Sequence, residues 1–234
     1  MFAWKKGNRM RYGMITGVLI AVSLAGCGRS SERQGDVAEQ TCPEGVIKTH
    51  CVVSYQQGNT PYWTDQQQVF CPSSVLFKAW GTEPEGTWQC TLDQEQYTTS
   101  GLGGAYMKTL PAGLMNAALA ELLYYSFTAG AGFEPSGMTP GEPVRIEGQR
   151  YEAFKIPETE SGKTLTYYKN ADTGQIELVQ VSEVKGVIWL ARSYNPRYND
   201  RFKRMIPRKI DIFDTQQGIS AKKLLIQFDY IDVQ

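Results

Sequence analysis

Five cysteines carry the most constrained chemistry in this 234-residue chain, and they stand at positions 27, 42, 51, 71 and 90. A cysteine thiol can bind a metal, form a disulfide, act as a nucleophile or carry a lipid. Zinc is disfavoured because the chain has no Cys-x-x-Cys pair and its only histidine is His50. We therefore expect no metal site and no cofactor. The roles that we consider for these thiols are therefore disulfide formation and lipid attachment.

Cys27 stands at the end of a segment organised like a secretory signal peptide. Four basic residues and no acid occur in the first eleven positions, and an apolar run over residues 12–24 follows. That run is shorter than the about 20 residues that a transmembrane helix needs. Residues 24–27, Leu-Ala-Gly-Cys, resemble the bacterial lipobox, after which the cysteine is diacylated and the peptide is cut.

This resemblance implies that residues 1–26 are a lipoprotein signal peptide and that Cys27 is the acylated first residue of the mature chain. Acyl chains on Cys27 would hold the protein on a bilayer, facing the periplasm. Gly28 occupies the position where an aspartate would retain an enterobacterial lipoprotein in the inner membrane, so we expect the outer membrane. The alternative is an ordinary signal peptide with a chance cysteine.

The four remaining cysteines all precede residue 91, and an even number in an exported chain predicts two disulfides. Three pairings are open. If residues 42–97 run as a meander of short strands, Cys51 lies opposite Cys71 across the first hairpin. That register favours Cys51–Cys71 and Cys42–Cys90.

Basic side chains concentrate between positions 192 and 209, where the only acid is Asp200 and aromatic residues are interleaved. This cluster could meet phosphate head groups or another anionic partner, or form a protein interface. It could equally be a solvated hairpin whose charges protect a sheet edge. Its members are Arg192, Arg197, Arg201, Lys203, Arg204, Arg208 and Lys209.

Enzyme signatures are missing from the sequence. There is no Gly-x-Ser-x-Gly and no phosphate-binding loop, and His50 adjoins a cysteine that we expect to be oxidised. Glu83 and Glu85 lie in a turn, although a hydrolase with two distant carboxylates stays open. Removing the basic leader leaves a net charge of −4, which is not a nucleic-acid-binding balance. We expect a non-enzymatic protein.

The elements that position these residues follow from hydrophobic patterning. Residues 27–40 form a polar, lipidated N-terminus and tether, and residues 41–234 are long enough for a single domain. Short strands alternate with turns up to residue 97. A helix is predicted at 111–129, with Pro111 at its first turn and Gly130 just past its end. This helix is apolar over most of its circumference, which indicates burial on more than one side.

From residue 144 onward, alternating segments separated by short turns predict consecutive antiparallel strands. Three stretches, at 165–176, 207–212 and 224–233, resemble the LolA/LolB/RseB-like superfamily of envelope proteins. The resemblance covers residues 145–233 best and 60–233 more loosely. It implies an α+β, mainly β fold, an open antiparallel half-barrel of roughly ten strands curled around the helix at 111–129.

Members of that superfamily carry, receive or sense lipid-linked material in an apolar cavity. The resemblance therefore implies a lipid, an acyl chain or a lipidated client as ligand, an envelope protein as a further candidate partner, and a role in lipoprotein sorting or envelope sensing. The alternative is a non-catalytic interaction or structural lipoprotein with a filled core. The candidate cavity residues, each of which could equally be a core residue, are Leu119, Leu123, Tyr167, Leu178, Trp189, Phe213, Leu224, Ile226 and Phe228.

Overall fold

The computed structural model describes residues 42, 45–57, 60–83, 86–94, 96–101, 117–156, 163–183, 186–215 and 223–234. The predicted signal peptide, Cys27, the tether and residues 111–116 lie outside the described residues. The described elements are β1 (Ile47–Gln57), β2 (Thr60–Cys71), β3 (Leu76–Glu83), β4 (Gly86–Asp93), β5 (Gln96–Gly101), α3 (Ala117–Gly130), β6 (Thr139–Pro140), β7 (Val144–Ile146), β8 (Gln149–Ile156), β9 (Thr164–Asn170), β10 (Ile176–Glu183), β11 (Gly186–Tyr194), β12 (Arg197–Asn199), β13 (Arg204–Ile206), β14 (Lys209–Asp214) and β15 (Lys223–Val233).

In the described part of the chain, thirteen strands form one antiparallel sheet, against the roughly ten expected. Its order is β5-β4-β3-β2-β1-β15-β14-β11-β10-β9-β8-β6, with β7 paired to β8. The last strand joins the two halves, because β15 lies between β1 and β14. The edge strands β5 and β6 do not pair, so the sheet stays open. The mainly β, open antiparallel half-barrel is confirmed.

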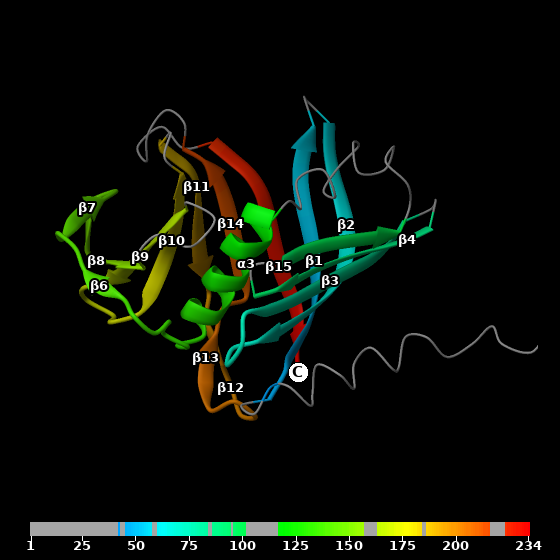
Figure 1. The fold of residues 1–234 in the computed structure, drawn as a ribbon, viewed down its shortest axis with the longest axis horizontal. Helices are drawn as coiled ribbons and strands as arrows, with labels where there is room; N and C mark the ends of the chain where they lie inside the picture. Colours follow the sequence, from blue (N-terminus) through cyan, green and yellow to red (C-terminus); the bar gives the residue numbers. More distant parts are fainter. Residues whose placement is uncertain are drawn as a thin grey trace, which may run out of the picture.

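Helix α3 lies against the concave face of this sheet (Figure 1). It contacts β3 and β4 from one half, and β10, β11 and β14 from the other. Its sequence is rich in alanine and leucine, which favour helix, and it is apolar nearly all round. Such a helix must be covered on several sides, and the curved sheet provides that cover. No described helix has the length and apolar character needed to cross a membrane.

The helix ends at Gly130, one residue beyond the predicted end, and the glycine that caps it is Gly132 rather than Gly130. Gly132, with φ of +78°, supplies the left-handed turn that stops it, and its amide donates to the carbonyl of Ala129 at 2.9 Å. The amide of Phe133 donates to the carbonyl of Thr128, completing a Schellman motif. Gly130 is instead a packing position, because a Cβ there would lie 2.9 Å from Ser193 Oγ.

Phe127 tests how far stability depends on the contact between helix and sheet. Its ring is 0% exposed, stacks on Phe70 with centroids 4.0 Å apart and lies 4.9 Å from the ring of Tyr230. Phe127→Ala should lower the free energy of unfolding by about 3–5 kcal/mol, because the cavity left behind cannot fully collapse. Trp63→Ala, at a ring that is 67% exposed, should change it by at most about 0.5 kcal/mol. Equal, small effects in urea denaturation would contradict this packing.

Candidate binding site

The concave face of the sheet, where an apolar cavity was expected, is filled along α3. Leu119, Leu122, Leu123 and Phe127 from the helix are each 1% exposed or less. The facing side chains from the sheet are buried to the same degree, among them Phe70, Phe77, Tyr167, Ile226 and Phe228. No water-sized space therefore adjoins these side chains.

The expected cavity residues divide between two faces of the sheet. Leu119, Leu123, Tyr167, Ile226 and Phe228 lie in the core beneath the helix, and Trp189 packs against its margin. The remaining three do not face the helix.

Leu178 and Phe213 belong to a second cluster on the opposite face, with Tyr168 and Leu190. Leu224 pairs with Phe213 and is 48% exposed. The inward assignment of these three was wrong. For Leu178 and Leu224 the reason is a bulge that interrupts the alternation, whereas Phe213 faces outward by regular alternation with Ile212, which lies in the core beneath the helix. One bulge lies between Ile176 and Leu178, and the other lies on β15 opposite Ile212 and Phe213. A shift of one residue moves a side chain to the other face of a sheet.

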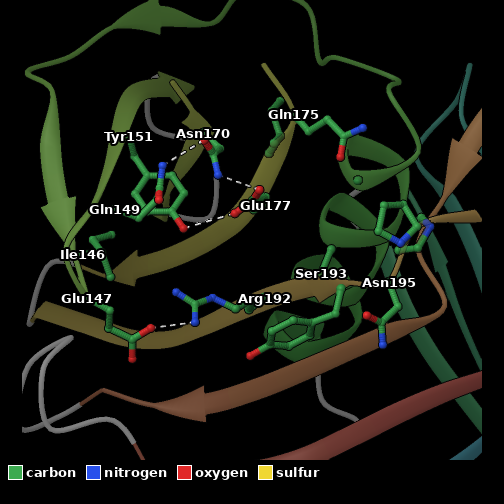
Figure 2. A pocket seen from close by; sticks show the side chains of 15 residues that line it. Ile146, Glu147, Gln149, Tyr151, Asn170, Gln175, Glu177, Arg192, Ser193 and Asn195 are labelled. Carbon is green, nitrogen blue, oxygen red and sulfur yellow. Dashed lines mark hydrogen bonds and ion pairs between the residues drawn. The ribbon is translucent and has the colours of Figure 1, made fainter. Parts of the chain in front are cut away.

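A polar cavity of about 370 Å³ lies beside the C-terminal end of α3, outside the packed core (Figure 2). The turns before β8 and β10 and the end of β11 enclose it. Most of its lining residues carry amide, hydroxyl or charged groups, although polar and apolar atoms share its surface about equally. The polar residues include Gln149, Asn170, Gln175, Glu177, Arg192 and Asn195. Its size fits a small ligand or part of a larger one.

The charged groups of this cavity are held by hydrogen bonds. Arg192 donates to Glu147 at 2.7 Å, and Glu177 accepts from Tyr151 at 3.1 Å and from Asn170 at 2.8 Å. Burial lowers the pKa of Arg192, but its bonds to Glu147 and Tyr194 outweigh this and leave the pKa raised. Arg192 thus stays positively charged, and the cavity combines nearly compensated charges with amide donors and acceptors.

Two residues of the cavity wall have a left-handed backbone without being glycine. Glu147 has φ of +53° and begins the tight turn between β7 and β8, a position that favours asparagine or glycine. Asn195 has φ of +48° and follows β11 directly. Such conformations are concentrated at binding sites. Here the turn brings the carboxylate of Glu147 to Arg192.

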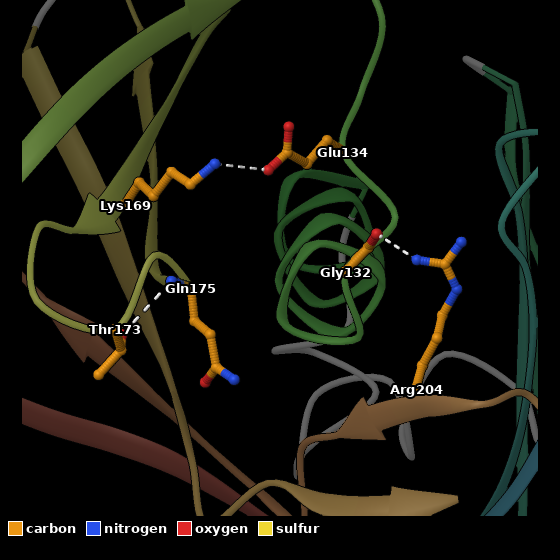
Figure 3. A network of polar contacts seen from close by, with 6 residues as sticks. All are labelled: Gly132, Glu134, Lys169, Thr173, Gln175 and Arg204. Atoms are coloured by element: carbon orange, nitrogen blue, oxygen red, sulfur yellow. Dashed lines mark hydrogen bonds and ion pairs between the residues drawn. The ribbon is translucent and has the colours of Figure 1, made fainter. Parts of the chain in front are cut away.

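A hydrogen bond, a cation–π contact and an ion pair hold the segment that follows α3 (Figure 3). Arg204 donates to the carbonyl of Gly132 at 2.6 Å, and its guanidinium lies 4.2 Å from the ring centroid of Phe133. On the other side, Lys169 donates to Glu134 at 2.9 Å. The segment that follows α3 is therefore tied to β9 and β13.

The structure separates the seven basic residues of the expected anionic patch. Arg192, Arg204 and Lys209 are engaged within the molecule, Lys209 with Asp211 at 3.7 Å. Arg208 is half-buried. Arg197, Arg201 and Lys203 are exposed on the β12–β13 hairpin. The patch that faces solvent is thus narrower than the sequence cluster.

The predicted pairing of the cysteines was wrong. Cys42 bonds to Cys71, while Cys51 and Cys90 are free and buried. The β1–β2 register places Cys51 opposite Gln66, five residues from Cys71. Cys51 and Cys90 lie on β1 and β4, separated by two strands or about 14 Å. A disulfide needs Cα atoms within about 7 Å.

Neither free thiol is placed for chemistry. Burial raises the pKa of Cys90 to about 12 and also raises that of Cys51. His50 contacts Asp65 at 3.1 Å on the exposed side of β1, whereas Cys51 points into the core. Among the described residues, no group of three or more His, Cys, Asp or Glu side chains could hold a metal.

Sequence reasoning missed the polar cavity because its residues lie in turns far apart along the chain. The turn signals were visible, in Glu147-Gly148, Asn170 to Gly174 and Asn195-Pro196. They mark where strands end, but not which turns meet. That depends on the order of strands in the sheet.

A thiol titration checks the cysteine assignment. At pH 8, Cys51 and Cys90 should react with Ellman's reagent only after unfolding, because burial keeps both thiols protonated. The titration uses the Cys27→Ala chain, which leaves four cysteines. Unfolding without reductant should release two thiols, and reduction two more. Rapid reaction of the native protein, or no thiol on unfolding, would contradict the assignment.

Comparison with known proteins identifies the fold. No family model and no curated protein sequence matches the chain. A LolA superfamily protein from Nitrosomonas europaea superimposes with a TM-score of 0.55 and 12% identity, over 88% of this chain and 94% of that one. A Vibrio parahaemolyticus domain named for outer-membrane lipoprotein sorting superimposes with a TM-score of 0.46 and 8% identity, over 87% of this chain and 89% of that one. A DUF1329 family protein from Desulfovibrio piger superimposes with a TM-score of 0.43 and 8% identity, over 86% of this chain and 89% of that one. On the first of these, the chain has the LolA-like fold that its C-terminal half resembles.

Proposed function

We propose that this chain is a membrane-anchored, non-catalytic binding protein of the bacterial cell envelope, closed on its concave side by its own helix. The lipobox-like Leu-Ala-Gly-Cys sequence supports an anchor at Cys27, and Gly28 favours the outer membrane. The LolA-like fold is consistent with a place in the envelope. Binding then takes place on the outside of the domain.

The filled space beneath α3 carries this proposal. A protein that takes up an acyl chain needs open apolar volume. Here Leu122, Leu123 and Phe127 occupy the volume that an acyl chain would need, and Phe70 and Tyr167 close it from the sheet. The helix acts as a fixed occupant of the half-barrel.

The alternative is that a lipid, an acyl chain or a lipidated client enters the half-barrel, as in lipoprotein sorting or envelope sensing. That function would require α3 to leave the sheet. Withdrawing four fully buried large side chains costs on the order of 6–12 kcal/mol, at about 1.5–3 kcal/mol each. The contacts of the ligand would have to offset this free energy before any net binding affinity resulted.

The polar cavity is the better candidate for ligand recognition. Within the described part of the chain, the side-chain amides of Gln175 and Asn195 line it without an internal hydrogen bond. Each amide offers both donors and an acceptor, a combination that suits hydroxyl or amide groups. With Arg192 and Glu147 paired and Glu177 hydrogen-bonded to neutral groups, the site disfavours an anion and suits a neutral polar group, such as part of a sugar or peptide.

Binding without turnover fits the state of the carboxylates in this cavity. Glu177 already accepts hydrogen bonds from Tyr151 and Asn170, and Glu147 accepts one from Arg192. A general acid or base needs a carboxyl within hydrogen-bonding reach of the substrate. Both carboxylates instead support the cavity wall, so an enzyme acting on glycan or ester is the weaker interpretation.

Native mass spectrometry of the full chain, processed in cells and extracted from membranes in detergent, tests the proposal. We expect a mass equal to residues 27–234 plus the acyl groups on Cys27, with no further lipid bound. Cys27→Ala should accumulate as unprocessed chain. A second, non-covalent lipid on the wild-type protein would overturn the closed half-barrel and favour the carrier function.

A further inference from the structure

The β12–β13 hairpin exposes an apolar pair at its centre. Tyr198 and Met205 lie directly opposite each other in the strand register. Tyr198 is 56% exposed and Met205 is 37% exposed. Their neighbour Phe202 turns inward and packs against the core. The outward pair is therefore left to solvent by the fold itself.

This apolar pair is surrounded by positive charge. Residues 197–206 contain four basic residues and one acid, Asp200, which gives a net charge of +3. Arg197, Arg201 and Lys203 are exposed, and no carboxylate of the described chain pairs with them. The nearest strand also brings an acid, Asp232, because Asn199 donates to the carbonyl of Val233 at 3.2 Å. The basic excess on the hairpin outweighs it.

The hairpin lies at the pole of the domain where the chain arrives from Cys27. A Cβ placed on Gly45 would lie 3.9 Å from Phe202 Cε1, so the start of the domain adjoins the hairpin tip. Figure 1 shows β12 and β13 beside the blue N-terminal end of β1. Fourteen residues separate Cys27 from Cys42. Even fully extended, they span at most about 50 Å.

We propose that the β12–β13 hairpin docks on the anionic phospholipid surface of the membrane that holds Cys27. This inference rests on the anchor in the proposed function. Arg197, Arg201 and Lys203 would meet lipid phosphates, while Tyr198 and Met205 enter the head-group layer. A short anchored chain keeps the hairpin at high effective concentration near that surface, so weak contacts suffice.

Docking would also orient the polar cavity. Asn195 and Pro196 precede the hairpin directly and Pro207 follows it, and all three line the cavity. A hairpin held on the bilayer therefore places the cavity at the membrane surface. Its ligand would be met there rather than deep in the periplasm.

Hydrogen exchange on vesicles tests the docking. The full, acylated chain is reconstituted on vesicles of phosphatidylcholine alone and on vesicles containing 30% phosphatidylglycerol. Amides 195–206 should exchange at least about fivefold more slowly on the anionic vesicles, the effect expected from one basic residue at such a surface. Sodium chloride at 0.5 M should remove the difference.

The double variant Arg197→Glu/Lys203→Glu should lose the slowing. Arg145→Glu/Lys155→Glu, with the same change of charge at exposed positions on β7 and β8, should keep it. Equal exchange on both vesicles, or slowing that survives in the first variant, would overturn the docking. Flotation separates this from failure of the anchor. Without the anchor the chain would not float with phosphatidylcholine vesicles, whereas an anchored chain whose hairpin does not dock would float with both kinds of vesicle and show equal exchange on them.

Discussion

The burial of α3 against the inner face of the sheet is the interaction on which the rest of this structure depends. A helix that is apolar nearly all round cannot remain in water, and a flat sheet would cover only one side of it. The strands therefore curl until β3 and β4 touch one flank and β10, β11 and β14 the other. Stacking of Phe127 on Phe70 joins the helix to the first half of the sheet. The space where the resemblance predicted an apolar cavity is here part of the core.

The open half-barrel was predicted from the resemblance of three C-terminal stretches to the LolA/LolB/RseB-like superfamily. Hydrophobic patterning was sufficient to predict the helix and the antiparallel strands, because both depend on local periodicity. It failed where an extra residue shifts the alternation. Leu178 and Leu224 were predicted to face inward, but bulges place them on the outer face, whereas Phe213 faces outward by regular alternation with Ile212. The predicted disulfide pairing was wrong for a related reason. Pairing depends on the β1–β2 register, which sets Cys51 opposite Gln66 and leaves Cys71 near Cys42. The polar cavity depends on strand order, which periodicity does not encode.

The charged residues are divided by what they contact. Arg192 and Arg204 are structural, one closing the cavity wall with Glu147 and the other fixing the chain after the helix through Gly132. Arg197, Arg201 and Lys203 face solvent at the pole where the chain enters the domain. A cluster that is continuous in sequence thus serves two purposes. The exposed part of this cluster is the surface that we propose docks on the membrane, with the polar cavity next to it.

Hydrogen exchange of the helix amides tests the sealed interior most directly. If α3 is a permanent part of the core, amides 121–129 should exchange only through global unfolding, with the same opening free energy as the central strands β1 and β15. Addition of phospholipid should leave their exchange unchanged. Exchange through a lower-energy opening, accelerated by lipid while β1 and β15 stay protected, would show that the helix leaves the sheet and that the half-barrel accepts a ligand.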